Sequence, residues 1–210
     1  MSYSSVITKM VKKSLWILRI IFCLMGWIIL IYDIATSKSL FLFLFYTIQS
    51  NFLVAVWLLL AILWDRKPEK YQKLTGLVRG GITLYITVTF LIFAILLAPL
   101  MPPDYAFDIT NILFHYLIPV YFIVDWFLTE RDTRYKWNYL PKWLIYPISY
   151  LILTLIYGLF TGFYPYFFID PSSLGVGPYI LSILGMTAFY LILGSIFIGI
   201  NRKFTQNYQI

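Results

Sequence analysis

Charged side chains are scarce in this sequence. Asp, Glu, Lys and Arg make up 12% of the 210 residues, whereas soluble domains contain about 25%. Hydrophobic residues make up 61%, against about 45–50% in soluble domains. A chain with so few polar side chains cannot cover the surface of a soluble globule, which indicates a protein that uses lipid as its solvent.

Cysteine and histidine are nearly absent. Cys23 is the single cysteine and His115 the single histidine. A lone cysteine cannot form an internal disulfide, and a protein zinc site takes three or four Cys, His or carboxylate ligands. We therefore expect no metal and no other cofactor.

Six long apolar runs make up most of the chain, each near the roughly 20 residues that a spanning helix needs. They lack the alternation of barrel strands, which favours helices. The sequence predicts an all-α, polytopic membrane protein with one domain over residues 1–210, a bundle of six transmembrane helices. Their predicted ranges are 15–34, 40–64, 77–98, 109–128, 143–163 and 177–200.

The basic residues fix the predicted orientation, because Lys and Arg accumulate on the cytoplasmic side of membrane proteins. Of the 16 basic residues, only Lys38 lies on the predicted outer side. The other 15 flank the opposite ends of the spans: Lys9, Lys12, Lys13, Arg19, Arg66, Lys67, Lys70, Lys73, Arg79, Arg131, Arg134, Lys136, Lys142, Arg202 and Lys203. Both termini are therefore predicted to be cytoplasmic, in the plasma membrane. Since orientation accounts for the positive charge, we expect no nucleic-acid partner.

Two clusters of polar side chains lie inside predicted spans, where they are costly and often functional. In the second span Thr47, Ser50 and Asn51 share one helical face, since they are spaced i, i+3, i+4. In the fourth, Asn111 and His115 share another. At 1.5 Å per residue, Thr47 and His115 each lie roughly 10 Å below the outer end of their span. The two clusters are therefore predicted to lie at one depth, in the outer leaflet.

A hydroxyl beside an imidazole can act as nucleophile and general base. We expect Thr47 to attack an acyl carbonyl while His115 takes its proton. Asp108, two turns above His115, is too far for contact, so a pair without a carboxylate, or one oriented by a backbone carbonyl, is predicted. Pro119 should bend the helix at His115, whose carbonyl it leaves without its usual amide donor. The candidate oxyanion donors or substrate-orienting groups are Gln49, Ser50, Asn51 and Asn111.

Other interpretations of these residues remain open. Polar side chains commonly bond neighbouring membrane helices together. In a transporter, the same polar cluster could bind a solute while His115 changes its protonation state. A structural or regulatory membrane protein is a third possibility. Asp125 is expected to be structural, paired with Arg131 or Arg134. Gly158 and Gly162 form a G-x-x-x-G helix-packing pattern.

The segment Asn111–Pro119, with Asp125 and Trp126 after it, resembles a small bacterial family of six-helix membrane proteins. That family looks like a distant relative of the androgen-induced and androgen-dependent membrane proteins of animals. Residues 46–51 match the family's other patch. The animal proteins are threonine hydrolases of fatty-acid esters of hydroxy fatty acids, and their Thr and His correspond to Thr47 and His115. The resemblance thus implies a lipid-like ester as substrate, with membrane lipids around the protein.

Overall fold

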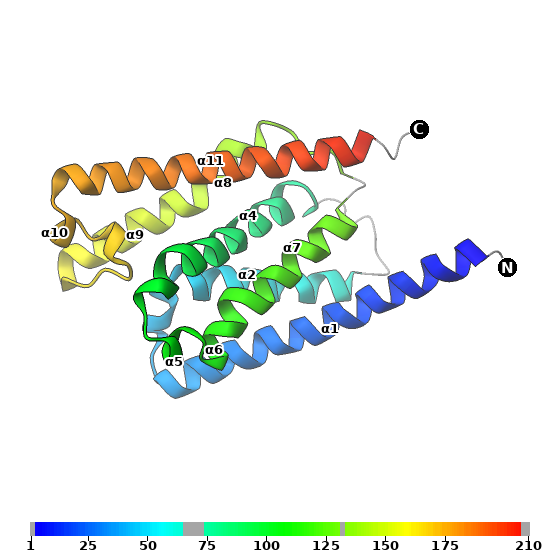
Figure 1. The fold of residues 1–210 in the computed structure, drawn as a ribbon, viewed down its shortest axis with the longest axis horizontal. Coiled ribbons are helices and arrows are strands. Elements are labelled where there is room, and N and C mark those ends of the chain that lie inside the picture. Colours follow the sequence, from blue (N-terminus) through cyan, green and yellow to red (C-terminus); the bar gives the residue numbers. More distant parts are fainter. Residues whose placement is uncertain (1–2, 65–73, 131–132, 207–210) are drawn as a thin grey trace. The chain divides into compact units, whose positions relative to one another are not determined.

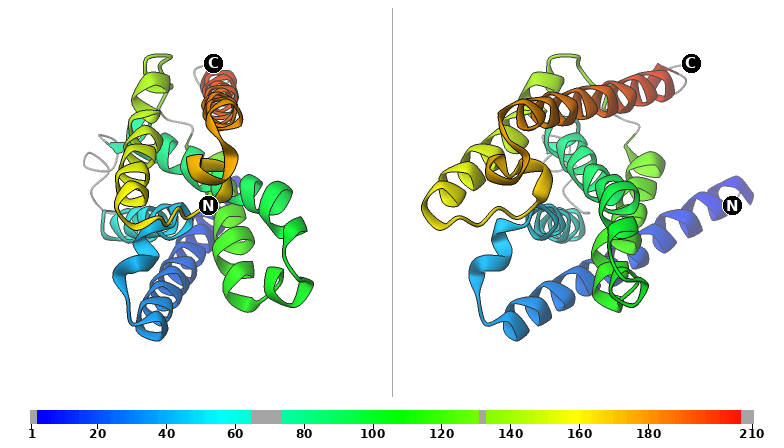
Figure 2. Two further views of the ribbon diagram at one scale, coloured as in Figure 1. Left: turned by 90° about the vertical axis from the view of Figure 1, so that its left-hand side faces the viewer. Right: turned by 60° about the vertical axis from the view of Figure 1, so that its left-hand side comes forward.

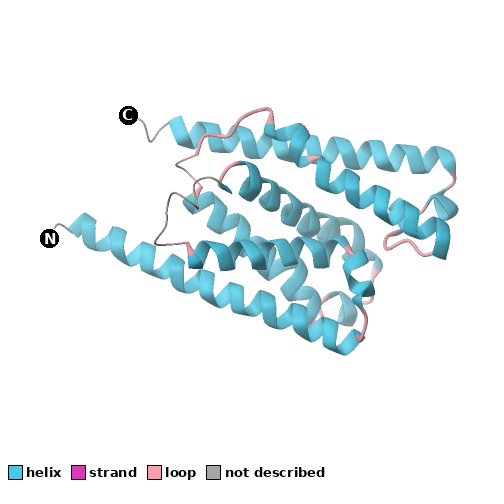
Figure 3. Ribbon diagram, turned by 180° about the vertical axis from the view of Figure 1, so that it is seen from behind, coloured by secondary structure: helices cyan, strands magenta, loops and turns pink. Residues whose placement is uncertain are grey.

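The computed structural model describes residues 3–64, 74–130 and 133–206, and this part of the chain contains helices and turns but no strand (Figure 3). Six of its helical segments are long and apolar enough to cross a membrane. They are Lys13–Ser37, Tyr46–Leu63, Leu77–Leu100, Ile109–Thr129, Tyr139–Thr161 and Val176–Thr205. The prediction of an all-α protein with six membrane-spanning helices is confirmed.

The α-helices are labelled in Figure 1. They are α1 (Tyr3–Ser37), α2 (Tyr46–Leu63), α4 (Leu77–Ile92), α5 (Pro103–Ala106), α6 (Ile109–Ile112), α7 (Ile118–Thr129), α8 (Tyr139–Trp143), α9 (Ile145–Thr161), α10 (Pro171–Leu174) and α11 (Val176–Gln206). Two π-helical turns, Phe93–Leu97 and Leu113–Leu117, interrupt the third and fourth spans. Short 3-10 turns lie at Leu40–Leu44, Ala98–Leu100 and Phe167–Ile169.

The second span begins later than predicted. Residues 40–44 form a 3-10 turn, and the α-helix starts only at Tyr46. The Ser39 hydroxyl accepts from the Phe41 amide (3.0 Å), and the Gln49 side chain donates to the Phe43 carbonyl (2.6 Å). These bonds hold the turn at the start of α2. The apolar run continues unbroken through the turn, so hydropathy gives no sign of it.

The chain divides into two compact units. The first comprises Met1–Phe43 and Thr47–Glu130, and the second Leu44–Tyr46 and Arg131–Ile210. The first unit thus carries four of the spans and the second carries two.

Helix α4 forms the core of the first unit, since every residue from Arg79 to Thr89 is buried. Helix α7 packs along α4 and also contacts α1 (Figures 1 and 2). Phe22 of α1 stacks on Tyr121 of α7 with ring centroids 3.7 Å apart. Elsewhere on α1 large apolar side chains are exposed, among them Ile21, Leu24, Ile28 and Ile31, which suits contact with lipid.

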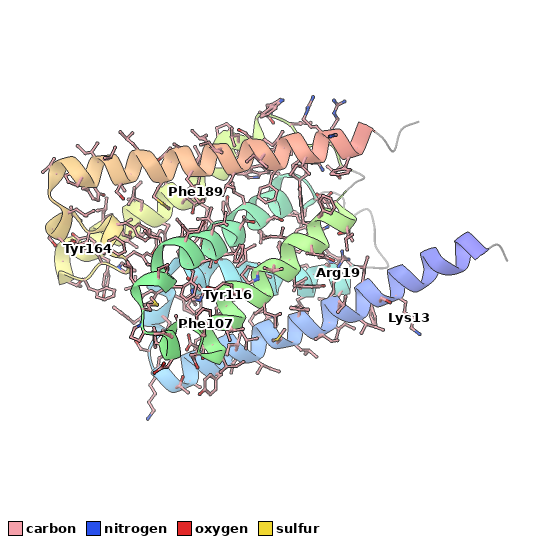
Figure 4. The ribbon with its side chains drawn as sticks, viewed as in Figure 1. Lys13, Arg19, Phe107, Tyr116, Tyr164 and Phe189 are labelled. Atoms are coloured by element: carbon pink, nitrogen blue, oxygen red, sulfur yellow. The ribbon has the colours of Figure 1, made fainter. Side chains whose placement is uncertain are left out.

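A buried ionic cluster joins three helices of this unit: Arg19 of α1, Arg79 of α4, Asp125 of α7, and Glu130 just after α7. The Arg79 guanidinium lies 2.6 Å from the Asp125 carboxylate and 3.0 Å from that of Glu130. Arg19, labelled in Figure 4, lies 3.0 Å from the other Asp125 oxygen. The predicted pairing of Asp125 with Arg134 is therefore wrong, because Arg79 and Arg19 bind this carboxylate instead. Arg131, the other predicted partner, lies outside the described residues.

In the second unit, Gly158 and Gly162 play different parts. A Cβ at Gly158 would overlap the Tyr164 ring, so the glycine makes room for the chain that follows α9. Gly162 ends α9 with φ 74°, a left-handed conformation that glycine adopts without steric cost. A Cβ at Gly162 would touch nothing within 4 Å. The G-x-x-x-G spacing thus reflects a helix end, not a pair packed against another helix.

The predicted orientation can be measured directly. Reporter fusions after Asp104 and Pro171 should report the outer side, and fusions after Lys70 and Arg134 the cytoplasmic side, because Lys and Arg favour the cytoplasmic side. Arg66, Lys67, Lys70 and Lys73 lie outside the described residues, so this test does not depend on their structure. A single fusion on the wrong side would contradict the orientation.

Candidate active site

Thr47 lies in the first turn of α2, as its second residue. The prediction of an α-helix from residue 40 is wrong, because the 3-10 turn Leu40–Leu44 comes before the α-helix that carries Thr47. Its hydroxyl lies in a partly buried position. The first turn of a helix carries the partial positive charge of the helix dipole.

His115 is the third residue of the π-helical turn Leu113–Leu117. This turn replaces the simple bend predicted from Pro119, which is the second residue of α7. The Ile118 amide donates to the Leu113 carbonyl, five residues back. π-turns of this kind often occur at functional sites, because the extra residue redirects a side chain.

The two side chains meet, which confirms the predicted proximity. Thr47 Oγ1 lies 3.1 Å from His115 Nε2. The other ring nitrogen, Nδ1, lies 3.2 Å from the Asn111 carbonyl oxygen. A carbonyl can only accept, so Nδ1 carries the proton of the neutral ring and Nε2 is left as the acceptor. The Thr47 hydroxyl therefore donates to Nε2, as a nucleophile does to its base.

Asn51 ties the Thr47 turn to the His115 turn. Its side-chain nitrogen donates to the Thr47 carbonyl at 2.9 Å and to the Phe114 carbonyl at 3.0 Å. These two bonds use both N–H groups of the amide, so Asn51 has no donor left for an oxyanion. Its role as an oxyanion donor is wrong for this conformation, and the bonds instead make it a clamp across the site.

The other three candidate donors also make local bonds. The Ser50 hydroxyl lies 2.7 Å from that of Thr89 and 3.1 Å from the Thr47 carbonyl. Gln49 holds the preceding 3-10 turn. The side-chain nitrogen of Asn111 donates to the Tyr105 carbonyl at 2.7 Å. Asn111 instead orients His115 through its backbone carbonyl.

The Asp108 carboxylate bonds to the start of α6 and not to the His115 imidazole. Its carboxylate caps the start of α6 by accepting from the Thr110 amide at 3.0 Å. Hydrogen bonds from Thr110 hold the pKa of this carboxyl below its usual range. This agrees with the expectation that Asp108 does not contact His115.

Sequence reasoning missed Phe93. Its ring stacks on the His115 imidazole, with centroids 3.6 Å apart and planes 14° from parallel. Phe93 opens the other π-turn, Phe93–Leu97, and Pro99 follows that turn by two residues as Pro119 follows Leu117. In the sequence the two segments share a proline six residues after the first residue of each turn, and this is the signal that could have linked them.

Replacing Asn51 with Leu should lower the activity of the Thr47–His115 pair more than it lowers the stability of the protein. The change removes both N–H donors while roughly keeping the volume, so Thr47 and His115 lose the bonds between their turns. We expect any activity of the pair to fall at least about tenfold, since misplacement of about 1 Å can cost a hundredfold. Buried polar bonds in membrane proteins contribute only about 0.6 kcal/mol on average, so the melting temperature should fall slightly.

Asn201→Leu is the matched control. Asn201 is also buried and also bonds two backbone groups, the Tyr135 amide (2.7 Å) and the Thr133 carbonyl (3.1 Å), but in the second unit. Equal losses of activity in both variants at equal melting temperature would contradict the clamp.

No group of three or more His, Cys, Asp or Glu that could hold a metal occurs in the described part of the chain. Comparisons of the chain with family models, with curated proteins and with solved structures each find no match. What can be inferred about its function comes from the Thr47–His115 pair and its surroundings.

Proposed function

We propose that this chain is an intramembrane hydrolase of lipid-like acyl esters, such as fatty-acid esters of hydroxy fatty acids, in the plasma membrane. Thr47 is the nucleophile and His115 the base. The observation that supports this most directly is the hydrogen-bonded series from Thr47 Oγ1 to His115 Nε2, and from Nδ1 to the Asn111 carbonyl.

In the acylation step, the Thr47 oxygen attacks the ester carbonyl carbon while its proton moves to His115 Nε2. The tetrahedral intermediate then collapses, the bond to the alcohol oxygen breaks, and that oxygen takes the proton from Nε2. In the second step, water gives a proton to Nε2 and attacks the acyl-threonine. The fatty acid leaves, and Thr47 recovers its proton.

The negative charge of the intermediate needs stabilisation. Thr47 lies in the first turn of the 18-residue helix α2, where backbone N–H groups and the helix dipole favour an anion. This position supports a role for the backbone of α2 in place of the side-chain amides, which bond elsewhere. Backbone donors of this kind cost little reorganisation during the reaction.

The choice of a lipid-like substrate follows from the surroundings of the pair. Thr47 and His115 lie within the membrane-spanning segments Tyr46–Leu63 and Ile109–Thr129. A substrate that reaches them from the bilayer must be apolar. Residues 46–51 and 111–119 resemble a small bacterial family that looks like a distant relative of the membrane threonine hydrolases of animals, which also supports this class of ester.

A covalent probe tests the proposal. The purified protein in detergent or nanodiscs should react with an alkyl fluorophosphonate, and mass spectrometry should find the label on Thr47. It should also release fatty acid from an ester of a hydroxy fatty acid. A folded protein that neither labels nor cleaves any acyl ester would favour a transporter or a structural protein instead.

A further inference from the structure

Within the described residues, no anionic side chain is bonded to the His115 imidazole. Its two ring nitrogens bond to a hydroxyl and to a backbone carbonyl, both neutral. In the first unit, Asp125 and Glu130 pair with arginines, and Asp108 caps α6. Yet the proposed reaction puts a full positive charge on this ring, in a position where 8% of the residue is exposed. Burying an unpaired charge is costly, so something must compensate for it.

The face of the imidazole is covered by Phe93. The two rings are almost parallel at 3.6 Å, and Phe93 is 2% exposed. The Tyr116 ring packs edge-on against Phe93 with centroids 5.7 Å apart, which restricts the Phe93 ring. An aromatic face carries partial negative charge and attracts a cation within about 6 Å of its centroid.

The backbone explains why these rings meet. Each comes from a five-residue π-turn, Phe93–Leu97 or Leu113–Leu117, in a helix that contains a proline two residues after the turn. A π-turn shifts the register of side chains relative to a regular α-helix. Phe93 is the first residue of one turn and His115 the third residue of the other, so the stacked pair joins the two turns.

We infer that Phe93 stabilises the positively charged form of His115 during the reaction, taking the part that a carboxylate plays in a three-residue catalytic set. This rests on the proposed function. Phe93 stacks on the imidazole of the proposed base, so it is a positioning and charge-stabilising residue that acts through His115. The neutral ring stacks on Phe93 by dispersion, whereas the protonated ring gains an additional cation–π attraction.

Stepwise fluorination of Phe93 tests the inference. Mono-, di- and trifluorophenylalanine at position 93 withdraw electrons from the ring face while nearly keeping its shape. The turnover number kcat should fall with each fluorine, by about tenfold over the series, which is the range expected of a buried cation–π pair. KM should change little, since the charge is absent when substrate binds. Melting temperatures should stay the same, because packing is preserved.

Phe90 provides the matched control. It lies three residues earlier on α4 and packs edge-on against Tyr116, with ring centroids 5.9 Å apart. The same fluorinated residues at position 90 should leave kcat unchanged. Phe93→Leu should lower kcat at least as much as trifluorination.

The outcomes separate the two proposals. If the wild type cleaves esters but kcat is flat across the fluorinated series, the role of Phe93 is wrong and the hydrolase stands. If kcat falls equally for fluorination at positions 90 and 93, the effect is not specific to the His115 stack and the inference is again wrong. If the folded wild type is inactive towards probe and esters, the proposed function fails and this inference fails with it.

Discussion

Thr47→Ala and His115→Ala are each expected to reduce hydrolysis of a hydroxy-fatty-acid ester by about a thousandfold or more. The double variant should be no slower than either single one. The two side chains act as a unit, because the Thr47 hydroxyl donates to His115 Nε2 at 3.1 Å and neither can activate the ester alone. The measurement is kcat/KM of the purified variants, with labelling by the fluorophosphonate as a second readout.

Ser50→Ala and Thr47→Ser are the controls. Ser50 lies on the same helix but bonds to Thr89 and to the Thr47 carbonyl, so its loss should have a small effect. Thr47→Ser keeps a hydroxyl and should retain part of the activity. The alanine variants should remain folded, since such deletions cost about 0.6 kcal/mol on average. A well-folded Thr47→Ala protein that hydrolyses the ester normally would show that another group is the nucleophile.

Composition and length predicted the helices well because a membrane span depends on mean hydropathy over about 20 residues. They could not predict how the second span begins. Residues 40–45 are as apolar as the helix that follows, and the 3-10 turn depends on single hydrogen bonds made by Ser39 and Gln49. Such bonds leave no periodic pattern in the sequence.

The contact between Thr47 and His115 followed from helical faces and from their places near the same end of two spans. The roles of the amides did not follow. Asn51 bonds the carbonyls of Thr47 and Phe114, and Phe114 belongs to the π-turn. Without the π-turn, the direction of that carbonyl cannot be inferred. Sequence patterns therefore predict the contact between Thr47 and His115 but not the hydrogen-bond partners of the side-chain amides around it.

Arg79 shows a second limit of sequence reasoning. The sequence predicts that it is one of several basic residues flanking a span, yet its side chain is fully buried. Its partners Asp125 and Glu130 are 46 and 51 residues away along the chain. Only the packing of α7 along α4 brings them together. A charged residue at the end of a span can thus be buried in the core. Its neighbours in sequence do not show whether it is buried or exposed.

Glu130 links the ionic cluster to the backbone. One of its carboxylate oxygens accepts from the Gly76 amide at 2.7 Å, and the other binds Arg79 at 3.0 Å. Gly76 precedes α4 and has φ 82°. The carboxylate thus lies at the N-terminus of α4, where the helix dipole favours negative charge. The cluster therefore stabilises both the start of α4 and its packing against α7.

Asp125→Ala is expected to destabilise the protein by about 3 kcal/mol, more than any other single substitution considered for this chain. The change removes the carboxylate that lies 2.6 Å from the buried Arg79 guanidinium and 3.0 Å from that of Arg19. Removing one partner of a buried pair costs about 3–5 kcal/mol because the remaining charge stays desolvated. Thermal melts and unfolding in SDS of the purified protein measure the loss.

Asp104→Ala is the matched control, because Asp104 is an exposed acid in the short helix α5. Its removal should change stability by less than about 0.5 kcal/mol. The double variant Arg79→Met with Asp125→Leu separates pairing from packing. If the ion pair matters, the double variant should lose less stability than the sum of its two single variants, by about 1–3 kcal/mol. Strict additivity would mean that the two charges do not stabilise each other, and the cluster would then contribute through packing and the bonds of Glu130 alone.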